Sequence, residues 1–507
     1  MRLLHASRDR VRRAFAAALP LPLVLGSVIP LPMAASAATL PNPILFVTQV
    51  PIPEDFTTIG SVFGNHLPSV QSAGRGGDLH LLYPSGKLRN LTREAGFGTD
   101  GFQGAGAIAV REPSVHWSGT RALFSMVVGA TTVRFEYVDT WWQIYEVTGL
   151  GENETAVITR VAKQPANSNN VSPLYGTDGR ILFTSDRPRG GEPHLYPQLD
   201  EYEEAPTNTG LWSLDPVSGD LTLLDHVPSG AFTPILDSFG RVVYTRWDHL
   251  QRDQQADSDD LEGNQYGTFD YADEGAGAVR TSNRVEVFPE PRAARQDLLA
   301  GTNQEGHSFN HFFPWQINED GTESEILNHL GRHELHEYFN RSLNDDDNLE
   351  EFIDGQSDRL NRNPLENFLQ IQEDPAQPGR YVGVDAPEFG THAAGRIVAL
   401  DASPSRHADQ IEVDYLTHPS TRGATEEGGS PEAGHSGHYR DPLPLSNGTL
   451  IAVHAAETRE DENAGSRELP ASRYAFRIKS LTSSGGYLTA GAPLTAGIRK
   501  TLWYWDP

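Results

Sequence analysis

Three histidines crowd into the segment ILNHLGRHELHEYF at residues 326–339. The imidazole of histidine is a common metal ligand, and together with carboxylates it suits zinc, iron or copper. His333 and His336 are therefore candidate ligands of a metal site. Their spacing is not the His-Glu-x-x-His of zinc proteases, so a site of that class is excluded. The simpler interpretation is that these histidines form hydrogen bonds with nearby backbone groups.

The elements that must position these histidines are β-strands, because helical periodicity is nearly absent from the sequence. Short apolar runs alternate with turns rich in Gly, Asp, Asn and Pro, which is typical of an all-β repeat protein. One unit recurs, with a glycine in its turn: Gly119, Gly179 and Gly240 each precede an apolar run. Glycine permits the positive φ of a tight hairpin. The sequence therefore predicts a hairpin at each of these glycines.

A second hairpin is expected between these units. The segments 79–92, 142–161, 211–225 and 315–327 each read as strand, turn and strand. Two hairpins make four strands, which is one blade of a β-propeller with WD40-like repeats. The fold class predicted is all-β, a six-bladed β-propeller with long acidic loop insertions. Trp117, Trp142, Trp212 and Trp315 recur at blade strands and are expected to pack between blades.

The predicted single propeller domain spans residues 38–507. Residues 44–50 are expected to supply a strand that closes the ring against the last blade. The fifth unit is expected to start at 367 and the sixth near Asn447. Insertions are expected at about 250–310, 340–366 and 419–437.

Propeller geometry suggests which other residues could join a metal site. His333 follows the crossing from one blade to the next, where the chain runs inward to the central channel. Residues of other inner loops could lie near it, and His249, Asp248 and His392 are the candidates. The sequence thus predicts a possible divalent metal at the mouth of the channel, from the set His333, His336, His392, His249 and Asp248.

The first 37 residues have the features of a signal peptide. Five arginines are followed by an apolar stretch that ends in Ala35-Ser36-Ala37, the small-x-small pattern of a signal peptidase site. No later stretch is apolar for the ~20 residues that a membrane-spanning helix needs. We therefore expect an exported protein, periplasmic or secreted, with no membrane span. The sequence leaves open the general and the twin-arginine export routes.

Composition excludes several classes of function. The chain has no cysteine, so it has no disulfides and cannot carry covalent c-type haem. Its formal net charge of -28 repels nucleic acid. The expected partner is a protein or a small molecule.

Two resemblances point to the same fold. Phe183-Thr184-Ser185-Asp186-Arg187 resembles the repeats of TolB-like propellers. The runs at 111–129, 242–254, 325–335, 387–401 and 437–454 together resemble exported bacterial proteins related to the hydrazine synthase α-subunit, in its middle domain. Both resemblances imply a six-bladed propeller. The second does not imply hydrazine synthesis, because the cysteines that tether the haems of that enzyme are missing here.

Three functions are compatible with these observations. The first is an exported binding or scaffold module that recognises its partner at the channel mouth and the insertion loops. The second is a metal- or haem-dependent oxidoreductase with a site at the channel mouth. The third is a hydrolase with a metal at the same place. A propeller fold alone does not decide between them.

Overall fold

A computed structural model describes most of the chain. The described ranges are 40–52, 69–187, 210–248, 268–269, 280–281, 311–327, 363–406, 411–461, 471–495 and 503–505, apart from residues 71, 134, 135, 137, 226–229, 364, 366, 388 and 389. The expected signal peptide lies outside these residues, as do His249, His333 and His336. Within the described ranges no helix is long and apolar enough to cross a bilayer.

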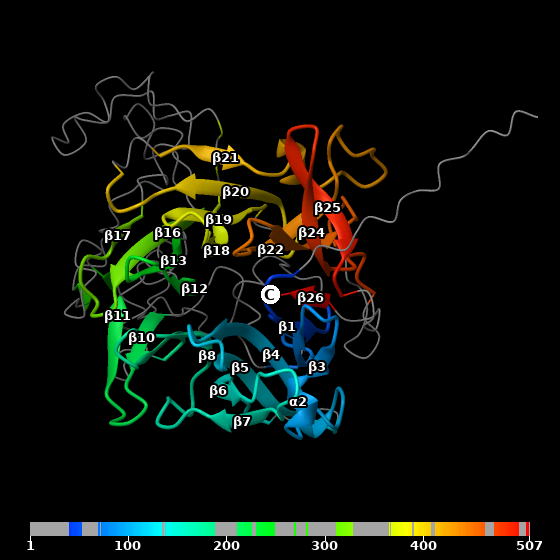
Figure 1. Ribbon diagram of the computed structural model, residues 1–507. Helices are drawn as coiled ribbons and strands as arrows, with labels where there is room; N and C mark the ends of the chain where they lie inside the picture. Colours follow the sequence, from blue (N-terminus) through cyan, green and yellow to red (C-terminus); the bar gives the residue numbers. More distant parts are fainter. Residues whose placement is uncertain are drawn as a thin grey trace, which may run out of the picture. The chain divides into compact units, whose positions relative to one another are not determined.

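Six four-stranded antiparallel sheets form a ring, which makes the fold a six-bladed β-propeller (Figure 1). Blade 1 contains β1 (Ile44–Gln49), β2 (Leu79–Leu82), β3 (Leu88–Asn90) and β26 (Trp503–Trp505). Blade 2 contains β4 (Gly104–Val115), β5 (Arg121–Ala130), β6 (Gln143–Thr148) and β7 (Val157–Arg160). Blade 3 contains β8 (Asn170–Tyr175), β9 (Ile181–Ser185), β10 (Gly210–Leu214) and β11 (Leu221–Asp225).

Blade 4 contains β12 (Ala231–Leu236), β13 (Arg241–Asp248), β16 (His311–Asn318) and β17 (Glu325–Ile326). Blade 5 contains β18 (Leu369–Glu373), β19 (Arg380–Asp385), β20 (Arg396–Asp401) and β21 (Val413–Tyr415). Blade 6 contains β22 (His438–Pro444), β23 (Leu450–Ala455), β24 (Arg477–Ser484) and β25 (Tyr487–Pro493). A short helix α2 (Leu91–Glu94) follows β3, and a 3₁₀ turn η8 (Pro419–Thr421) follows β21. The all-β six-bladed propeller predicted from the sequence is confirmed.

The ring is closed by pairing between the two ends of the described chain. Strand β26 pairs with β1 in an antiparallel register that sets Trp505 opposite Val47 and Trp503 opposite Gln49. The prediction for residues 44–50 was wrong in its partner: β1 belongs to the first blade, and the late strand β26 crosses over to join it. This pairing joins segments hundreds of residues apart, so local sequence carried no signal for it.

The glycine turns occupy the first hairpin of each of blades 2 to 6. Gly119, Gly179 and Gly240 adopt φ values of 69°, 86° and 83°, and Gly379 and Gly448, in the equivalent turns of blades 5 and 6, adopt 85° and 79°. These angles are strained for residues with a Cβ, which is why glycine recurs there. The predicted hairpins are confirmed.

The strand before each of these glycines is the innermost strand of its blade. Blade 6 therefore starts at His438, and the predicted start near Asn447 was too late. Asn447 lies in the turn between β22 and β23 instead. Of the predicted insertions, 250–310 contributes one small described hairpin, β14 (Thr268–Phe269) with β15 (Arg280–Thr281). Most of that insertion and nearly all of 340–366 lie outside the described residues.

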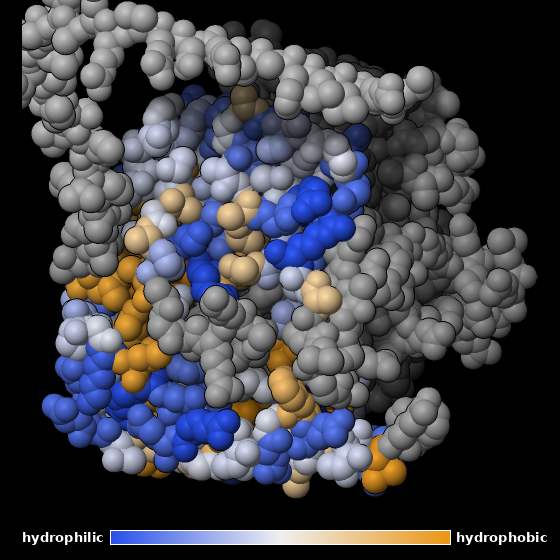
Figure 2. Space-filling model, turned by 90° about the vertical axis from the view of Figure 1, so that its right-hand side faces the viewer, coloured by the Kyte–Doolittle hydropathy of each residue, from blue (hydrophilic) through white to orange (hydrophobic). Residues whose placement is uncertain are grey.

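Apolar side chains are buried between neighbouring blades. Leu123 and Ile144 of blade 2 pack with Phe183 and Trp212 of blade 3, and one large cluster joins blades 6, 1 and 2 across the closure. Burial of apolar area between blades supplies the main stabilising term, because a single four-stranded blade cannot cover its own faces. On the side of the ring that carries blades 1 and 6, the described surface is mostly hydrophilic (Figure 2).

The tryptophan prediction is confirmed for three residues and wrong for one. Trp142 is fully buried and Trp212 nearly so, and Trp315 is partly buried against the apolar clusters between blades 3, 4 and 5, whereas Trp117 is 65% exposed. Trp117 follows the end of β4 and lies in the turn before β5, outside the packed interface.

Candidate functional site

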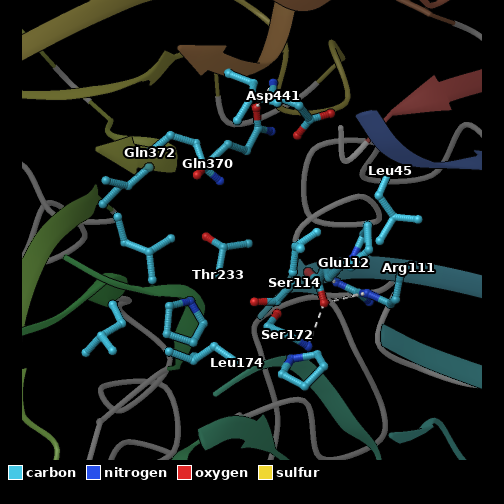
Figure 3. Close-up of a pocket in the computed structure, with 18 of the residues that line it drawn as sticks. Leu45, Arg111, Glu112, Ser114, Ser172, Leu174, Thr233, Gln370, Gln372 and Asp441 are labelled. Carbon is cyan, nitrogen blue, oxygen red and sulfur yellow. Dashed lines mark hydrogen bonds and ion pairs between the residues drawn. The ribbon is translucent and has the colours of Figure 1, made fainter. Parts of the chain in front are cut away.

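A cavity of about 500 Å³ lies on the axis of the ring and is the candidate site (Figure 3). Its lining comes from the inner strands β4, β8, β12, β18 and β22, with β1 and β13 adding a few residues. Because each blade turns its first strand to the axis, one short segment of every repeat faces the same space. Ligand pockets in proteins commonly have this size.

Each of the five inner strands carries a β-bulge at the same place. The register shifts between Arg111 and Ser114, and equivalent shifts occur in β8, β12, β18 and β22. The residue at each bulge has a positive φ without being glycine: Glu112 (51°), Ser172 (50°), Thr233 (46°), Gln370 (56°) and Asp441 (44°). We call these five residues the bulge ring. Bulges of this kind re-aim a side chain and are frequent beside functional sites.

The bulge ring is strained, and its side chains surround the cavity. A non-glycine residue in such a backbone conformation costs on the order of 1–3 kcal/mol and persists only where its surroundings hold it. In four of the five strands a proline follows the ring residue, as at Glu112-Pro113 and Asp441-Pro442. Figure 3 shows ring residues from blades 2 to 6 around one space. The fold therefore holds five strained polar residues at one level of the channel.

Ring residues are linked from blade to blade. The Glu112 carboxylate accepts a hydrogen bond from the Ser172 backbone N–H at 2.8 Å. The Gln370 side-chain oxygen accepts one from the Asp441 backbone N–H at 2.7 Å. These bonds cross between neighbouring blades, so they fix both the angle of each bulge and the spacing of the blades.

The acidic members of the ring are neutralised by adjacent arginines. Arg111 donates from Nε and Nη2 to Glu112, at 3.0 and 2.7 Å. Arg440 donates from Nε to Asp441 at 2.7 Å. Both arginines are nearly buried, being 4% exposed. Such buried, bidentate pairs hold both partners in place, so the cavity presents paired acidic and basic side chains together with hydroxyl and amide groups.

His392 is the one predicted metal ligand whose side chain the structure describes. Its side chain is fully buried, and its Nε2 lies 2.8 Å from the Asp461 carboxylate. That carboxylate also accepts hydrogen bonds from the Ser472 hydroxyl and the Arg473 backbone N–H. His392 does not line the cavity. It fastens the loop after β19 to the loop after β23, and its carbonyl oxygen accepts from Arg440 at 2.8 Å.

The other predicted ligands are not brought together within the described part of the chain. Asp248 ends β13, where its backbone lies opposite His311, and its side chain is not described. His249, His333 and His336 lie outside the described residues. Across the described ranges, the histidines and carboxylates form no group of three that could hold a metal ion. The metal site therefore remains a prediction.

Sequence reasoning missed two buried histidines in blade 6. Burial and the neighbouring His435 lower the pKa of His438 to about 4, and burial together with the Lys479 charge lowers the pKa of His454 to about 3. Lys479 donates to Nδ1 of His454 at 2.8 Å, which leaves Nε2 to donate to the Ser436 carbonyl. Both imidazoles are therefore neutral near pH 7. The clustering of histidines at 435–438 was the only signal in the sequence.

The polar part of the described lining consists mainly of hydroxyl, amide and ion-paired groups. The residues that line the cavity within the described ranges include no histidine, and their two acids, Glu112 and Asp441, are ion-paired.

Comparisons with known proteins agree on the fold. No protein-family model and no curated protein sequence matches the chain. Among solved structures, hydrazine synthase from Kuenenia stuttgartiensis matches with a TM-score of 0.50 at 13% identity, covering 92% of this chain and 46% of that one. TolB from Acinetobacter baumannii matches with a TM-score of 0.34 at 9% identity, covering 89% of this chain and 66% of that one.

The likeness to hydrazine synthase concerns the fold, since the identity is 13% and the chain spans 46% of that protein. The resemblance predicted from the repeat motifs is thereby confirmed at the level of architecture. The chain is a six-bladed β-propeller whose fold is similar to part of hydrazine synthase.

Proposed function

We propose that this protein is an exported binding protein that takes a ligand, or a segment of a partner, into the axial cavity. The observation that carries the proposal is the bulge ring. Five blades share the same strained, non-glycine conformation around one cavity of about 500 Å³. Strain that recurs at one level of the channel is costly to stability, so a role for the presented side chains in binding explains its presence.

The chemistry of the lining supports binding over catalysis. Ser114, Ser172, Thr233, Gln370 and Gln372 offer hydroxyl and amide groups, and the charged groups are already paired. Such groups orient a ligand and discriminate between ligands by hydrogen bonding.

Export is part of the proposal and rests on the N-terminal sequence. The arginine-rich start, the apolar stretch and Ala35-Ser36-Ala37 fit a cleaved signal peptide. The net charge of -28 disfavours nucleic acid as the partner. Mass spectrometry of the secreted or periplasmic protein would test this directly, and we expect the mature chain to start at Ala38.

Filling the cavity tests the binding proposal. The purified mature chain would be screened by thermal shift against a library of sugars, amino acids, organic acids and short peptides. We expect at least one class to raise the melting temperature, and Ser114→Trp to abolish that increase, because Ser114 lines the cavity. The matched control is Val217→Trp, since Val217 is 82% exposed in the turn between β10 and β11.

Two results would count against the proposal. One is a library that leaves the melting temperature unchanged throughout. The other is a ligand whose effect survives Ser114→Trp but is lost in the control variant, which would place binding on the outer surface of the propeller.

Metal analysis distinguishes the oxidoreductase alternative from the proposed binding function. Elemental analysis and a visible spectrum of the purified protein would detect stoichiometric metal or haem. Bound metal that is lost on His333→Ala or His336→Ala would favour the metal-dependent function over binding alone.

A further inference from the structure

Blade 2 departs from blades 3 and 4 at the rim of the cavity. At the fourth residue after the bulge proline, blades 3 and 4 carry Thr177 and Ser238, whereas blade 2 carries Trp117. Thr177 donates from its N–H and its hydroxyl to Glu319 of the next blade, at 2.8 and 2.7 Å. Ser238 makes the same pair of bonds to Glu373. Blade 2 thus has a large aromatic residue at the position where blades 3 and 4 have a small residue that donates two hydrogen bonds to the next blade.

Trp117 is held in place although it is 65% exposed. The ring of His116 lies against it with the centroids 4.0 Å apart, and that ring packs edge-on to Tyr175 at 4.8 Å. Nδ1 of His116 is bonded to the Ser118 hydroxyl at 2.8 Å, which fixes the imidazole. An exposed, pre-oriented indole loses little side-chain entropy when a ligand covers it. Trp117 also lines the cavity, so it stands at its entrance.

Blade 2 departs from blade 6 deeper in the cavity. Arg111 and Arg440 occupy equivalent positions, each directly before its acidic ring residue. Nη1 of Arg440 donates to the His392 carbonyl at 2.8 Å. Nη1 of Arg111 is buried and meets no acceptor within the described residues. A buried donor left unsatisfied costs about 1–3 kcal/mol. Because Nη1 has almost no exposed surface, a ligand oxygen reaches it only when the guanidinium turns toward the cavity that Arg111 lines.

The charges of the site favour a neutral ligand with many oxygens. Glu112 stands beside Arg111 and would repel a carboxylate or phosphate that approached the same guanidinium. The net charge of -28 also repels anionic ligands. Hydroxyl groups, by contrast, can accept from Arg111 and exchange hydrogen bonds with Ser114 and Ser172.

We propose that the blade-2 wall of the cavity binds a neutral oligosaccharide; this inference rests on the proposed function. One sugar ring stacks its C–H face on Trp117, since that face is apolar and complements the negative face of the indole. A hydroxyl oxygen of a second sugar ring accepts from Nη1 of Arg111 once the guanidinium turns toward it. Arg111 and Val115 lie in the same strand, whose rise of about 3.3 Å per residue separates them by roughly 10–13 Å, and Trp117 lies beyond Val115, so a ligand that touches both anchors has more than one ring.

Calorimetry with defined oligosaccharides tests this inference. The mature protein would be titrated with maltohexaose, cellohexaose, xylohexaose and chitohexaose, and with hexagalacturonate as an acidic comparison. We expect at least one neutral hexamer to bind more tightly than hexagalacturonate. Trp117→Thr, which installs the residue of blade 3, and Arg111→Lys, which keeps a positive charge beside Glu112, should each weaken binding at least 10-fold.

The matched control is Phe239→Ser. Phe239 is an exposed aromatic residue in the corresponding turn of blade 4, and it does not line the cavity. Its replacement should leave the affinity unchanged. Trp117→Thr alters an exposed side chain, so its melting temperature should match the wild type, and the test does not depend on the folding of Arg111→Lys.

The outcomes separate this inference from the proposed function. Failure of all four neutral hexamers to bind, or binding that is indifferent to Trp117→Thr, overturns the oligosaccharide inference. If a peptide or another ligand from the thermal-shift library still loses its effect in Ser114→Trp, the binding function stands while the oligosaccharide is wrong. If nothing binds in either experiment, the binding function and the oligosaccharide inference are both wrong.

Discussion

At the scale of the residue, the positive φ angles of the bulge ring lower the free energy of unfolding. Thr233 is the most strained member by type, because a β-branched side chain at a φ of 46° is a genuine outlier. Its hydroxyl faces the cavity with those of neighbouring blades (Figure 3). The backbone conformation of Thr233 directs its side chain toward the cavity, and the surrounding sheet holds that conformation.

Replacing Thr233 by asparagine should relieve this strain. Asparagine tolerates positive φ better than a β-branched residue does, so Thr233→Asn should raise the free energy of unfolding by about 0.5–1 kcal/mol. Denaturant titration would measure it. The control Ser114→Asn lines the same cavity at an ordinary φ and should bring no gain. A loss of stability in Thr233→Asn would show that the bulge is not strained.

The buried histidines of blade 6 predict how stability depends on pH. The folded state holds His438 and His454 with pKa values of about 4 and about 3, below the ordinary value of 6.5. The unfolded chain therefore binds more protons between these values, and stability falls as the pH drops below about 6.5. For His438 the loss is on the order of 3 kcal/mol once the pH lies below 4.

Unfolding in denaturant at pH 7, 5 and 4 would check this prediction. Burial raises the pKa of Asp186 to about 6, which works in the opposite direction and stabilises the fold as the pH falls. The informative quantity is therefore the difference between wild type and His438→Gln. The variant should lose less stability on acidification, and equal losses in the two proteins would contradict the assignment.

At the scale of the element, the first hairpin of each of blades 2 to 6 depends on a glycine in its turn. A Cβ at Gly179 would meet no atom within 4 Å, so its backbone angle alone resists substitution. Gly179→Ala should cost about 1–2 kcal/mol. Gly423→Ala is the matched control, because that site is equally open and its φ lies outside the positive region. The control should be neutral or stabilising by up to about 1 kcal/mol, and equal effects in both variants would contradict the account.

The hairpins could be predicted from sequence, and the inner strands could not be predicted fully. A turn glycine followed by an apolar run is a local signal, so the turns at Gly119, Gly179 and Gly240 were found. The bulges interrupt the alternation of side chains in the preceding strands, so the start of blade 6 was placed too late. Positive φ at Glu112 or Thr233 has no signal in residue type, and the cavity they frame was missed for that reason.

The candidate metal site shows the same limit. Placing His392 at an inner loop was reasonable from the repeat, but whether its side chain faces the channel depends on contacts with Asp461 and Tyr474. Those residues are distant in sequence, so no spacing rule relates them to His392. Trp117 was assigned to the core because it follows a strand pattern, and the turn that exposes it lies one residue beyond β4.

At the scale of the whole molecule, closure turns six thin sheets into one core. The strand β26 joins β1, and the largest apolar cluster continues from blade 6 through blade 1 to blade 2. A chain that ends at residue 502 lacks β26 and leaves β1 as an open edge. We expect this truncation to lower the melting temperature clearly and to increase aggregation.

Thermal unfolding of the mature and truncated chains, followed by circular dichroism, would measure that effect. Truncation at residue 505, which keeps β26, is the control and should unfold close to the full-length chain. If removal of 503–507 left the melting temperature unchanged, the closure by β26 would not hold the ring together.

The most direct test of the central claim is a crystal structure of the mature protein with the ligand selected by the binding screens. The account predicts ligand density in the axial cavity, in contact with Ser114, Ser172 or Thr233, with its outer part against Trp117. Ligand density confined to the outer faces of the blades, with the cavity unchanged, would contradict it.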